Sequence, residues 1–226
     1  MKNDFFKEVE ATLFDLEGTL VDFQWNLTEA VQEVFEMLRT SGFPMERIQS
    51  KKYSTLMKEA MRVALELGRS SDQIREKIGT IYDQYDEDAL TRWTLRPKAR
   101  DFLSAIKGKG VKTGLVSNVG KKALEKALQK TNILQFFDVI ISRNDVQNLK
   151  PSGEGIDLAL NRLQVTEEKS LFIGDSLDDI HAAKEAGLRV IIILGGENPK
   201  PDLLSANPGL LVNGFAELLA YLEEKT

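Results

Sequence analysis

The spacing of hydrophobic and polar residues changes twice along the chain. A short run of β-branched and aromatic residues stops abruptly at Asp15, and Gly18 follows closely, which predicts a buried strand that ends in a turn. Between residues 22 and 93 the apolar positions recur at helical spacing, and no strand pattern interrupts them. From Pro97 onwards, short apolar runs alternate with helical stretches, a pattern typical of βαβ units around a parallel sheet.

The same spacing predicts the individual elements. In the helical region we expect helices over residues 26–41, over 54–67 and from 70 onwards, with a short separate turn over 87–92. In the alternating region we expect strands over residues 111–117, 139–141, 171–173, 190–194 and 210–212. Helices are expected around residues 102–106, 124–128, 152–163, 178–186 and 215–222, whereas the segment 198–208 contains three prolines and is expected to be a surface loop.

These elements predict an α/β fold with an insertion. A Rossmann-like core of three layers, α/β/α, would surround a parallel sheet and carry an inserted all-helical cap domain. The core is expected to comprise residues 1–21 and 95–226, and the cap residues 22–94. Because the insertion follows the first strand at its carboxyl end, where open α/β sheets bind ligands, it would cover the site as a lid.

Composition narrows the possible functions. The chain has 226 residues, of which 30 are basic and 35 acidic, so its net charge of −5 lacks the positive surface of a general nucleic-acid binder. It has no cysteine, which excludes disulfides and thiolate metal sites and fits a reducing cytoplasm. No run approaches the ~20 apolar residues of a membrane span. We therefore expect a soluble cytoplasmic protein with no nucleic-acid or membrane partner.

Carboxylates gather at the ends of two predicted strands. Asp15 ends the first strand, and the stretch after a later one contains Asp175, Asp178 and Asp179. If these strands are neighbours, two or three carboxylates converge: Asp175 and Asp179 are one helical turn apart and can face one point with Asp15 if the helix begins between them. An all-oxygen cluster suits Mg²⁺, which often binds substrate phosphate as well. Capping of the following helix by Ser176 or Asp178 is the alternative interpretation for part of this stretch.

Two further stretches offer groups that bind anions. Ser117 and Asn118 follow another predicted strand and precede a helix, where a hydroxyl, an amide and backbone N–H groups form an anion site. The same residue pair is also common in ordinary turns. Lys150 lies directly before Pro151 at the start of a further helix. An acidic site that handles phosphate needs a fixed positive charge nearby, although a lone lysine usually faces solvent.

Other polar and aromatic residues have simpler explanations. Trp25 and Trp93 flank the expected insertion and are expected to serve packing. His181 is the only histidine and follows the acidic motif, so no histidine-based mechanism is expected. Cations in and beside the cap could contact an anionic substrate, but such charges are more often a solvated face; they are Lys51, Lys52, Lys58, Arg62 and Arg96.

Together these stretches resemble the haloacid dehalogenase superfamily, in particular its magnesium-dependent phosphatases, which include phosphoglycolate phosphatase and relatives of β-phosphoglucomutase. The matching motifs are Asp-Leu-Glu-Gly-Thr-Leu from Asp15, the pair Ser117 and Asn118, Lys150 with its proline, and Gly-Asp-Ser-Leu-Asp-Asp from Gly174. Their order and spacing agree along the whole core, which is far more specific than any one motif. The helical insertion has the position of the family's helical cap.

The resemblance implies a nucleophile and a metal site. Asp15 would attack phosphorus and form an aspartyl-phosphate, which water can cleave. Mg²⁺ would be bound by Asp15, by the backbone carbonyl of Glu17 and by Asp175, with Asp179 supporting it directly or through water. The implied reaction is the hydrolysis of a phosphomonoester.

The resemblance also implies how the substrate is held. Ser117 or Asn118 would bind the phosphoryl oxygens. Lys150 would offset the negative charge of Asp15 and of the transferring group. The substrate would be a small phosphorylated metabolite.

Glu17 departs from the family's pattern, which usually has aspartate at this position. That residue protonates the leaving oxygen and later activates water. The additional methylene of Glu17 displaces the carboxyl by ~1.5 Å, and misplacements near 1 Å can cost on the order of 10²-fold in rate. The chain is then either a working phosphatase or a catalytically weak protein that binds or senses phosphate ligands.

Two further activities are alternatives. A phosphomutase would depend on a bisphosphate activator. A metal-free dehalogenase would use the aspartate on carbon, but it would not need the acidic cluster that includes Asp175 and Asp179.

Overall fold

The computed structural model describes residues 5–223, and within them six parallel strands form one sheet. Their order across the sheet is β3-β2-β1-β4-β5-β6. This arrangement confirms the predicted α/β fold, including the predicted strand at the β6 edge. The strands are β1 (Ala11–Phe14), β2 (Lys112–Val116), β3 (Val139–Ile141), β4 (Ser170–Gly174), β5 (Arg189–Ile193) and β6 (Leu210–Val212).

β1 lies at the centre of the sheet, between β2 and β4. All four of its side chains are fully buried, because a parallel strand is covered on both faces; three of them are apolar, and Thr12 is the polar exception. Phe14, its last residue, lies beside Leu115 of β2 and Ile173 of β4. The residues that follow these three strands therefore leave the sheet at the same edge.

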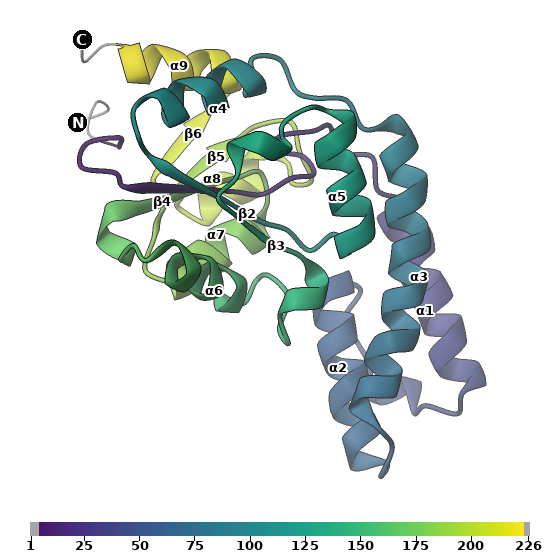
Figure 1. The fold of residues 1–226 in the computed structure, drawn as a ribbon. Helices are drawn as coiled ribbons and strands as arrows, with labels where there is room; N and C mark the ends of the chain where they lie inside the picture. Colours follow the sequence, from purple (N-terminus) through teal and green to yellow (C-terminus); the bar gives the residue numbers. More distant parts are fainter. Residues whose placement is uncertain (1–4, 224–226) are drawn as a thin grey trace. The chain divides into compact units, whose positions relative to one another are not determined.

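Helices cover both faces of this sheet (Figure 1). α4 and α9 lie side by side on one face, where the rings of Phe102 and Phe215 are in contact, and α6 and α7 cover the other face. The three-layer core is thereby confirmed. Its helices are α4 (Ala99–Gly108), α5 (Lys121–Lys130), α6 (Glu154–Leu163), α7 (Leu177–Glu185), α8 (Lys200–Ser205) and α9 (Phe215–Glu223).

α8 lies inside the segment 198–208, so the prediction of a continuous surface loop there is wrong. Pro199 is the N-cap residue of α8, and Pro201 lies in its first turn. The backbone N–H groups of a first turn have no partner within the helix, so proline is well tolerated there. Leu203 is fully buried and anchors the helix.

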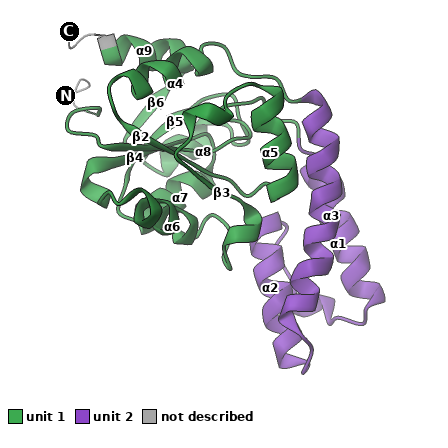
Figure 2. Cartoon of the chain, in the orientation of Figure 1, with its two compact units in different colours: residues 1–24, 93–226 green, residues 25–92 purple. Residues whose placement is uncertain are grey.

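The chain divides into two compact units (Figure 2). Unit 1 contains the sheet and combines the chain up to Gln24 with the chain from Trp93 onwards, and unit 2 is Trp25–Arg92. The sequence predicted the two boundaries after residue 21 and before residue 95, a few residues away along the same connecting segments. The function of unit 2 as a cap domain stays a prediction.

Unit 2 is built from α1 (Leu27–Thr40), α2 (Tyr53–Glu66) and α3 (Ser71–Arg92), with a short 3-10 helix, η2 (Met45–Arg47). The prediction of a separate turn over residues 87–92 is wrong, because α3 continues to Arg92. No glycine or proline interrupts this stretch, and Arg92 forms an ion pair with Asp88 one turn earlier, at 2.6 Å.

Aromatic side chains form much of the interior of unit 2. The ring of Trp25 contacts the rings of Tyr53, Tyr82 and Tyr85, and Tyr53 also contacts Tyr82. The hydroxyl of Tyr82 donates to the backbone carbonyl of Tyr53 at 2.9 Å. The prediction that Trp25 serves packing is therefore confirmed.

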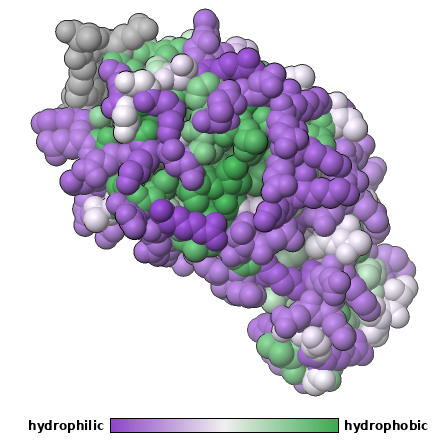
Figure 3. Space-filling view, in the orientation of Figure 1, coloured by the Kyte–Doolittle hydropathy of each residue, from purple (hydrophilic) through white to green (hydrophobic). Residues whose placement is uncertain are grey.

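Polar side chains cover most of the face seen in Figure 3, and a hydrophobic area remains in the region of β2 and β3. β3 is an edge strand of only three residues, and a short edge offers few unpaired backbone groups to another chain. Among residues 5–223, no helix combines the length and the apolar character that a membrane span requires.

Candidate active site

Two neighbouring strands deliver carboxylates to the same edge of the sheet. Asp15 directly follows β1 and Asp175 directly follows β4, while Asp179 lies in the first turn of α7. Oxygen atoms of these three side chains lie within 4.8 Å of one another, and the exposed fractions of the residues are only 6%, 1% and 1%. Of the two or three carboxylates that the sequence suggested would converge, the structure brings together all three. Asp178 is also buried but lies outside this cluster.

The start of α7 fixes the Asp179 side chain. Ser176 is the N-cap residue: its Oγ accepts a hydrogen bond from Asp179 N at 3.1 Å, and Asp179 Oδ2 accepts one from Ser176 N at 3.1 Å. Asp179 Oδ2 also accepts from Asp175 N at 3.0 Å. Capping and the acidic cluster therefore coexist, and the cap residue is Ser176 rather than Asp178.

Lys150 lies between two of the three carboxylates. Its Nζ donates to Asp15 Oδ1 and to Asp179 Oδ1, each at 2.6 Å, and the residue is buried. Asn118 holds the backbone of Lys150 on both sides, since Asn118 Oδ1 accepts from Lys150 N and Asn118 Nδ2 donates to Lys150 O, both at 3.0 Å. The ammonium is thus a fixed charge within the cluster.

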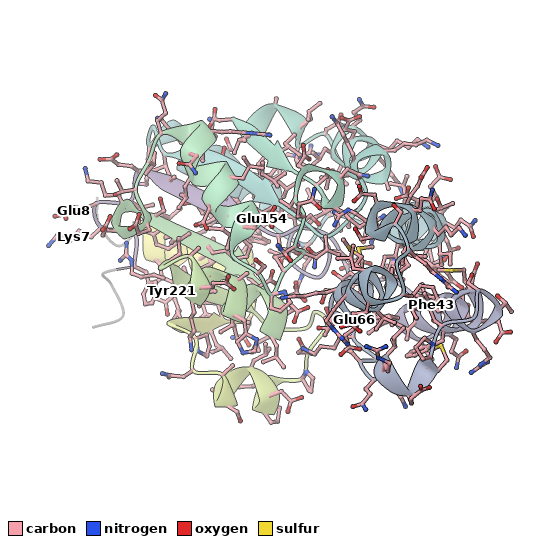
Figure 4. The ribbon with its side chains drawn as sticks, turned by 90° about the horizontal axis from the view of Figure 1, so that it is seen from below. Lys7, Glu8, Phe43, Glu66, Glu154 and Tyr221 are labelled. Atoms are coloured by element: carbon pink, nitrogen blue, oxygen red, sulfur yellow. The ribbon has the colours of Figure 1, made fainter. Side chains whose placement is uncertain are left out.

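Additional contacts hold the two loops that contain Lys150 and Asn118. Glu154, labelled in Figure 4, accepts hydrogen bonds from the backbone N–H groups of Gln147 at 2.6 Å and Asn148 at 2.8 Å, which folds the loop just before Lys150. The buried Arg143 donates from Nη1 to Asn118 O at 2.8 Å. Sequence reasoning missed these contacts, which join residues that are several to many positions apart.

Ser117 and Asn118 follow β2 at the edge where Asp15 follows β1. Ser117 is buried, and its Oγ accepts a hydrogen bond from Val119 N at 3.3 Å. The amide of Asn118 is engaged with the backbone of Lys150, 32 residues away. Asn118 therefore positions Lys150, a role that the local sequence did not indicate.

Burial and charge together set the pKa values of the cluster. Burial raises the pKa of Asp15 to about 6, with the Lys150 ammonium opposing this rise and the Asp179 carboxylate adding to it. Burial, followed by the charges of Asp179 and Asp15, raises the pKa of Asp175 well above its usual value. Burial acts to lower the pKa of Lys150, but the carboxylates of Asp15 and Asp179 outweigh it and raise that pKa.

The chemistry of the cluster fits a hard divalent cation. If its three carboxylates were ionised, the cluster with its one ammonium would carry a formal charge of −2, which one divalent cation would neutralise. Both oxygens of Asp179 accept hydrogen bonds from the protein, and so do both oxygens of Asp175. Lys150 donates to Asp15 through Oδ1, which leaves Asp15 Oδ2 as the carboxylate oxygen of the cluster best placed to bind a cation.

Two glycines make room for Asp175. A Cβ at Gly18 would lie 2.3 Å from Asp175 Oδ2, and a Cβ at Gly196 would lie 2.0 Å from the same atom. Gly18 also has φ of +84°, a conformation that favours glycine. Thr19 Oγ1 donates to Asp175 Oδ1 at 2.8 Å, and Glu197 N donates to Asp175 Oδ2 at 2.7 Å. The sequence analysis did not identify the loop that contains Gly196 and Glu197. The pair Gly195 and Gly196, which follows β5, was a usable signal for it.

Glu17 is held by residues from both connecting segments of unit 1. Its Oε1 accepts hydrogen bonds from Gln24 N at 2.8 Å and from Trp93 Nε1 at 2.9 Å. Trp93 is almost fully buried, so the packing role expected from its sequence is present. Its hydrogen bond to Glu17 was not expected, because 76 residues separate the two.

The remaining candidates have local roles. The Arg96 guanidinium donates to the backbone carbonyls of Gly18 and of Leu194, the latter at 2.6 Å, and so joins the loop after β1 to the end of β5. Arg62 forms an ion pair with Glu66 at 2.6 Å on the surface of unit 2. His181 is exposed on α7.

Comparison with known proteins decides the family. Residues 12–193 match the sequence profile described as haloacid dehalogenase-like hydrolase. The chain belongs to this family. The phosphoglycolate phosphatase of Salmonella choleraesuis (strain SC-B67) is 30% identical to this hydrolase over 239 residues, which cover 97% of this chain and 94% of the relative. That of Escherichia coli (strain K12) is 28% identical over 237 residues, covering 96% and 94%.

Solved structures share the fold of this hydrolase. A hydrolase from Pseudomonas syringae superposes with a TM-score of 0.70 at 22% identity, covering 96% of this chain and 99% of that one. CbbY from Rhodobacter sphaeroides, solved in complex with phosphate, superposes with a TM-score of 0.64 at 25% identity, covering 95% and 99%. With the curated relatives, these findings assign the hydrolase to the phosphatase branch, as its motifs predicted.

Proposed function

We propose that this phosphatase hydrolyses a small phosphorylated metabolite in a Mg²⁺-dependent reaction through an aspartyl-phosphate at Asp15. The observation that supports this most strongly is the buried cluster of Asp15, Asp175 and Asp179, with Lys150 between two of them. Phosphoglycolate is the first candidate substrate, because the curated relatives described above are named phosphoglycolate phosphatases.

In the first step Asp15 attacks phosphorus. A bond forms between an Asp15 carboxylate oxygen and phosphorus, the bond from phosphorus to the leaving oxygen breaks, and Glu17 gives that oxygen a proton. Ser117, with the backbone N–H groups at the start of α5, would bind the phosphoryl oxygens. Lys150 offsets the charge that gathers on these oxygens and on Asp15.

A metal ion completes this arrangement. Mg²⁺, held by Asp15, Asp175 and the backbone carbonyl of Glu17, with support from Asp179, would neutralise the excess negative charge and polarise the phosphoryl group. The hydrogen bonds of Thr19 and Glu197 to Asp175 orient that carboxylate.

In the second step water cleaves the aspartyl-phosphate. Glu17, now ionised, accepts a proton from water, whose oxygen bonds to phosphorus as the bond from Asp15 breaks. Asp15 and a protonated Glu17 are restored, and inorganic phosphate is released. The same carboxyl thus acts first as an acid and then as a base.

Unit 2 is proposed to act as the cap that selects the substrate. Its insertion point supports this role, because both connecting segments lie close to Glu17 along the chain or in hydrogen-bond contact with it. Asp22 N also donates to Thr94 O at 3.1 Å, which joins the two segments to each other. A cytoplasmic location and the absence of nucleic-acid partners stay predictions, which the lack of cysteine and the negative net charge support.

The alternatives have less support. The curated relatives are named as phosphatases, and this does not favour a non-catalytic phosphate-binding protein. A metal-free dehalogenase would not need a cluster of three buried carboxylates, because it binds no cation there. A phosphomutase predicts that activity requires a bisphosphate, which the experiment below includes as a condition.

The test is release of inorganic phosphate from phosphoglycolate, other small phosphomonoesters and one activated aryl phosphate. Wild type is compared with Asp15→Asn and with Asp101→Asn, a control at an exposed carboxylate of α4. We expect release that requires Mg²⁺, persists in Asp101→Asn and disappears in Asp15→Asn. Folded wild-type protein that releases no phosphate with any substrate, with or without a bisphosphate, would overturn the proposal.

A further inference from the structure

The Glu17 carboxylate has an unusual partner in the indole of Trp93. The Trp93 Nε1–H donates to Glu17 Oε1 at 2.9 Å, and Gln24 N donates to the same oxygen at 2.8 Å. Trp93 is 1% exposed, so its ring is held by packing. An indole N–H only donates and cannot rotate independently of its ring, so the position of the ring sets the position of the carboxylate oxygen.

The chain contains an internal comparison for this contact. Trp25 is also buried, but among the described residues its Nε1 has no hydrogen-bond partner. Burial of a tryptophan in this protein therefore does not require a partner for the indole. The contact between Trp93 and Glu17 is a specific feature of the loop that follows Asp15.

The backbone around Glu17 is fixed as well. Gly18 N donates to Val21 O at 2.8 Å, and Arg96 N donates to Leu20 O at 2.8 Å, which ties this turn to the segment that begins with Trp93. What remains variable is the long glutamate side chain, whose conformational freedom must be restricted to fix the carboxylate. Two donors on one oxygen supply that restriction.

We propose that Trp93 is a positioning residue for Glu17, and that the longer carboxylate of this hydrolase is held in its working place by the indole N–H. The inference rests on the proposed function, because it assumes that Glu17 protonates the leaving oxygen. A shorter aspartate at this position would withdraw its carboxyl by ~1.5 Å from the indole, a displacement large enough to lose a hydrogen bond. Glu17 and Trp93 therefore form one functional pair.

The test is Trp93→Phe, which keeps an aromatic ring and removes the N–H donor. We expect kcat/KM for an alkyl phosphomonoester to fall on the order of 10- to 100-fold, because its alkoxide must be protonated as it leaves. For an activated aryl phosphate, whose leaving group needs little protonation, we expect a loss below about 3-fold. Trp25→Phe is the matched control, and it should leave the ratio of the two kcat/KM values unchanged.

A double-mutant cycle separates positioning from simple packing. In a Glu17→Asp background the contact is absent, so Trp93→Phe should cause no further change in the ratio of alkyl to aryl kcat/KM. Equal losses for both substrates, or the same change of ratio in both backgrounds, would show that Trp93 has only a structural role.

A second variant protects the test against misfolding. Benzothienylalanine at position 93 keeps the shape of the indole and replaces its N–H with sulfur, so it should reproduce the Trp93→Phe ratio without disturbing the fold. An unchanged ratio in this variant, with active wild type, would overturn the inference alone. Inactive wild type would instead overturn the proposed function.

Discussion

The acidic cluster of unit 1 and an ion pair on the surface of unit 2 place charged side chains in opposite environments. In unit 1, Lys150, Asp15 and Asp179 form ion pairs of 2.6 Å in which the side chains are at most 9% exposed. In unit 2, the ion pair of Arg62 with Glu66 also measures 2.6 Å, but its side chains are 53% and 36% exposed; Glu66 is labelled in Figure 4. The ion pairs have equal distances, but their different burial gives them different effects on the free energy of unfolding.

The difference shows which charges serve function. In an exposed ion pair, each charge replaces its hydration by a partner of similar strength. Such a pair therefore contributes only about 0–1 kcal/mol to the free energy of unfolding. Buried charges must lose their hydration, and a well-packed apolar substitute is often as stable. The buried cluster is therefore better explained by the chemistry at Asp15 than by stability.

Lys150→Met tests the difference between the buried and the exposed ion pairs, and it has the largest expected effect. It leaves three buried carboxylates without their ammonium, so we expect the free energy of unfolding to fall by about 3–5 kcal/mol. Added Mg²⁺ should recover part of that loss by binding the folded state. Urea unfolding with and without Mg²⁺ measures both effects, and Arg62→Met is the matched control, with an expected loss of about 1 kcal/mol or less. Equal losses of unfolding free energy in Lys150→Met and Arg62→Met would show that the buried and the exposed ion pairs do not differ.

Gly196→Ala sharpens the comparison within unit 1. The added Cβ would lie 2.0 Å from Asp175 Oδ2, so this carboxylate must move. We expect phosphate release to slow on the order of 10²-fold, because a displacement near 1 Å has that effect on catalytic groups. In Gly108→Ala, the new Cβ meets no atom within 4 Å, and activity should stay at the wild-type level. Full activity of Gly196→Ala would contradict the proposed role of Asp175.

Removal of the ion pair between Asp138 and Lys107 has the smallest expected effect on the free energy of unfolding, because this pair is only half-buried. Burial acts to raise the pKa of Asp138, but hydrogen bonds from Lys107 and from Thr113 outweigh it and lower the pKa below 3.8. A lowered folded-state pKa contributes stability that is present above pH 3.8 and lost as the pH falls through the folded value.

Asp138→Asn should therefore cost about 0.5–1 kcal/mol at pH 7. The difference from wild type should shrink as the pH falls below 3.8. Thermal unfolding of both proteins across this pH range measures it. A difference that stays constant with pH would show that the charge of Asp138 is not responsible.

The sequence predicted the sheet well because buried parallel strands are rich in apolar residues, which form short runs between the helical stretches. β3 and β6 agree with their predicted ranges to the residue. α8 and the end of α3 were missed, since proline and polar residues suggested interruptions that the structure does not contain. Local patterns thus locate elements better than they locate their ends.

The site was predictable where it depends on the order of strands. Asp15, Asp175 and Asp179 meet because neighbouring parallel strands end at one edge. The contacts of Asn118 with Lys150 and of Trp93 with Glu17 were not predictable, because each joins segments whose spatial approach no local pattern encodes.

Trapping of the covalent intermediate tests the central claim most directly. Wild type would be mixed with an activated aryl phosphate and Mg²⁺, quenched rapidly in acid and examined by mass spectrometry. We expect one phosphoryl group on the peptide that contains Asp15, and none in Asp15→Asn. Phosphate release without any such label, or a label on another residue, would contradict the assignment of Asp15 as the nucleophile.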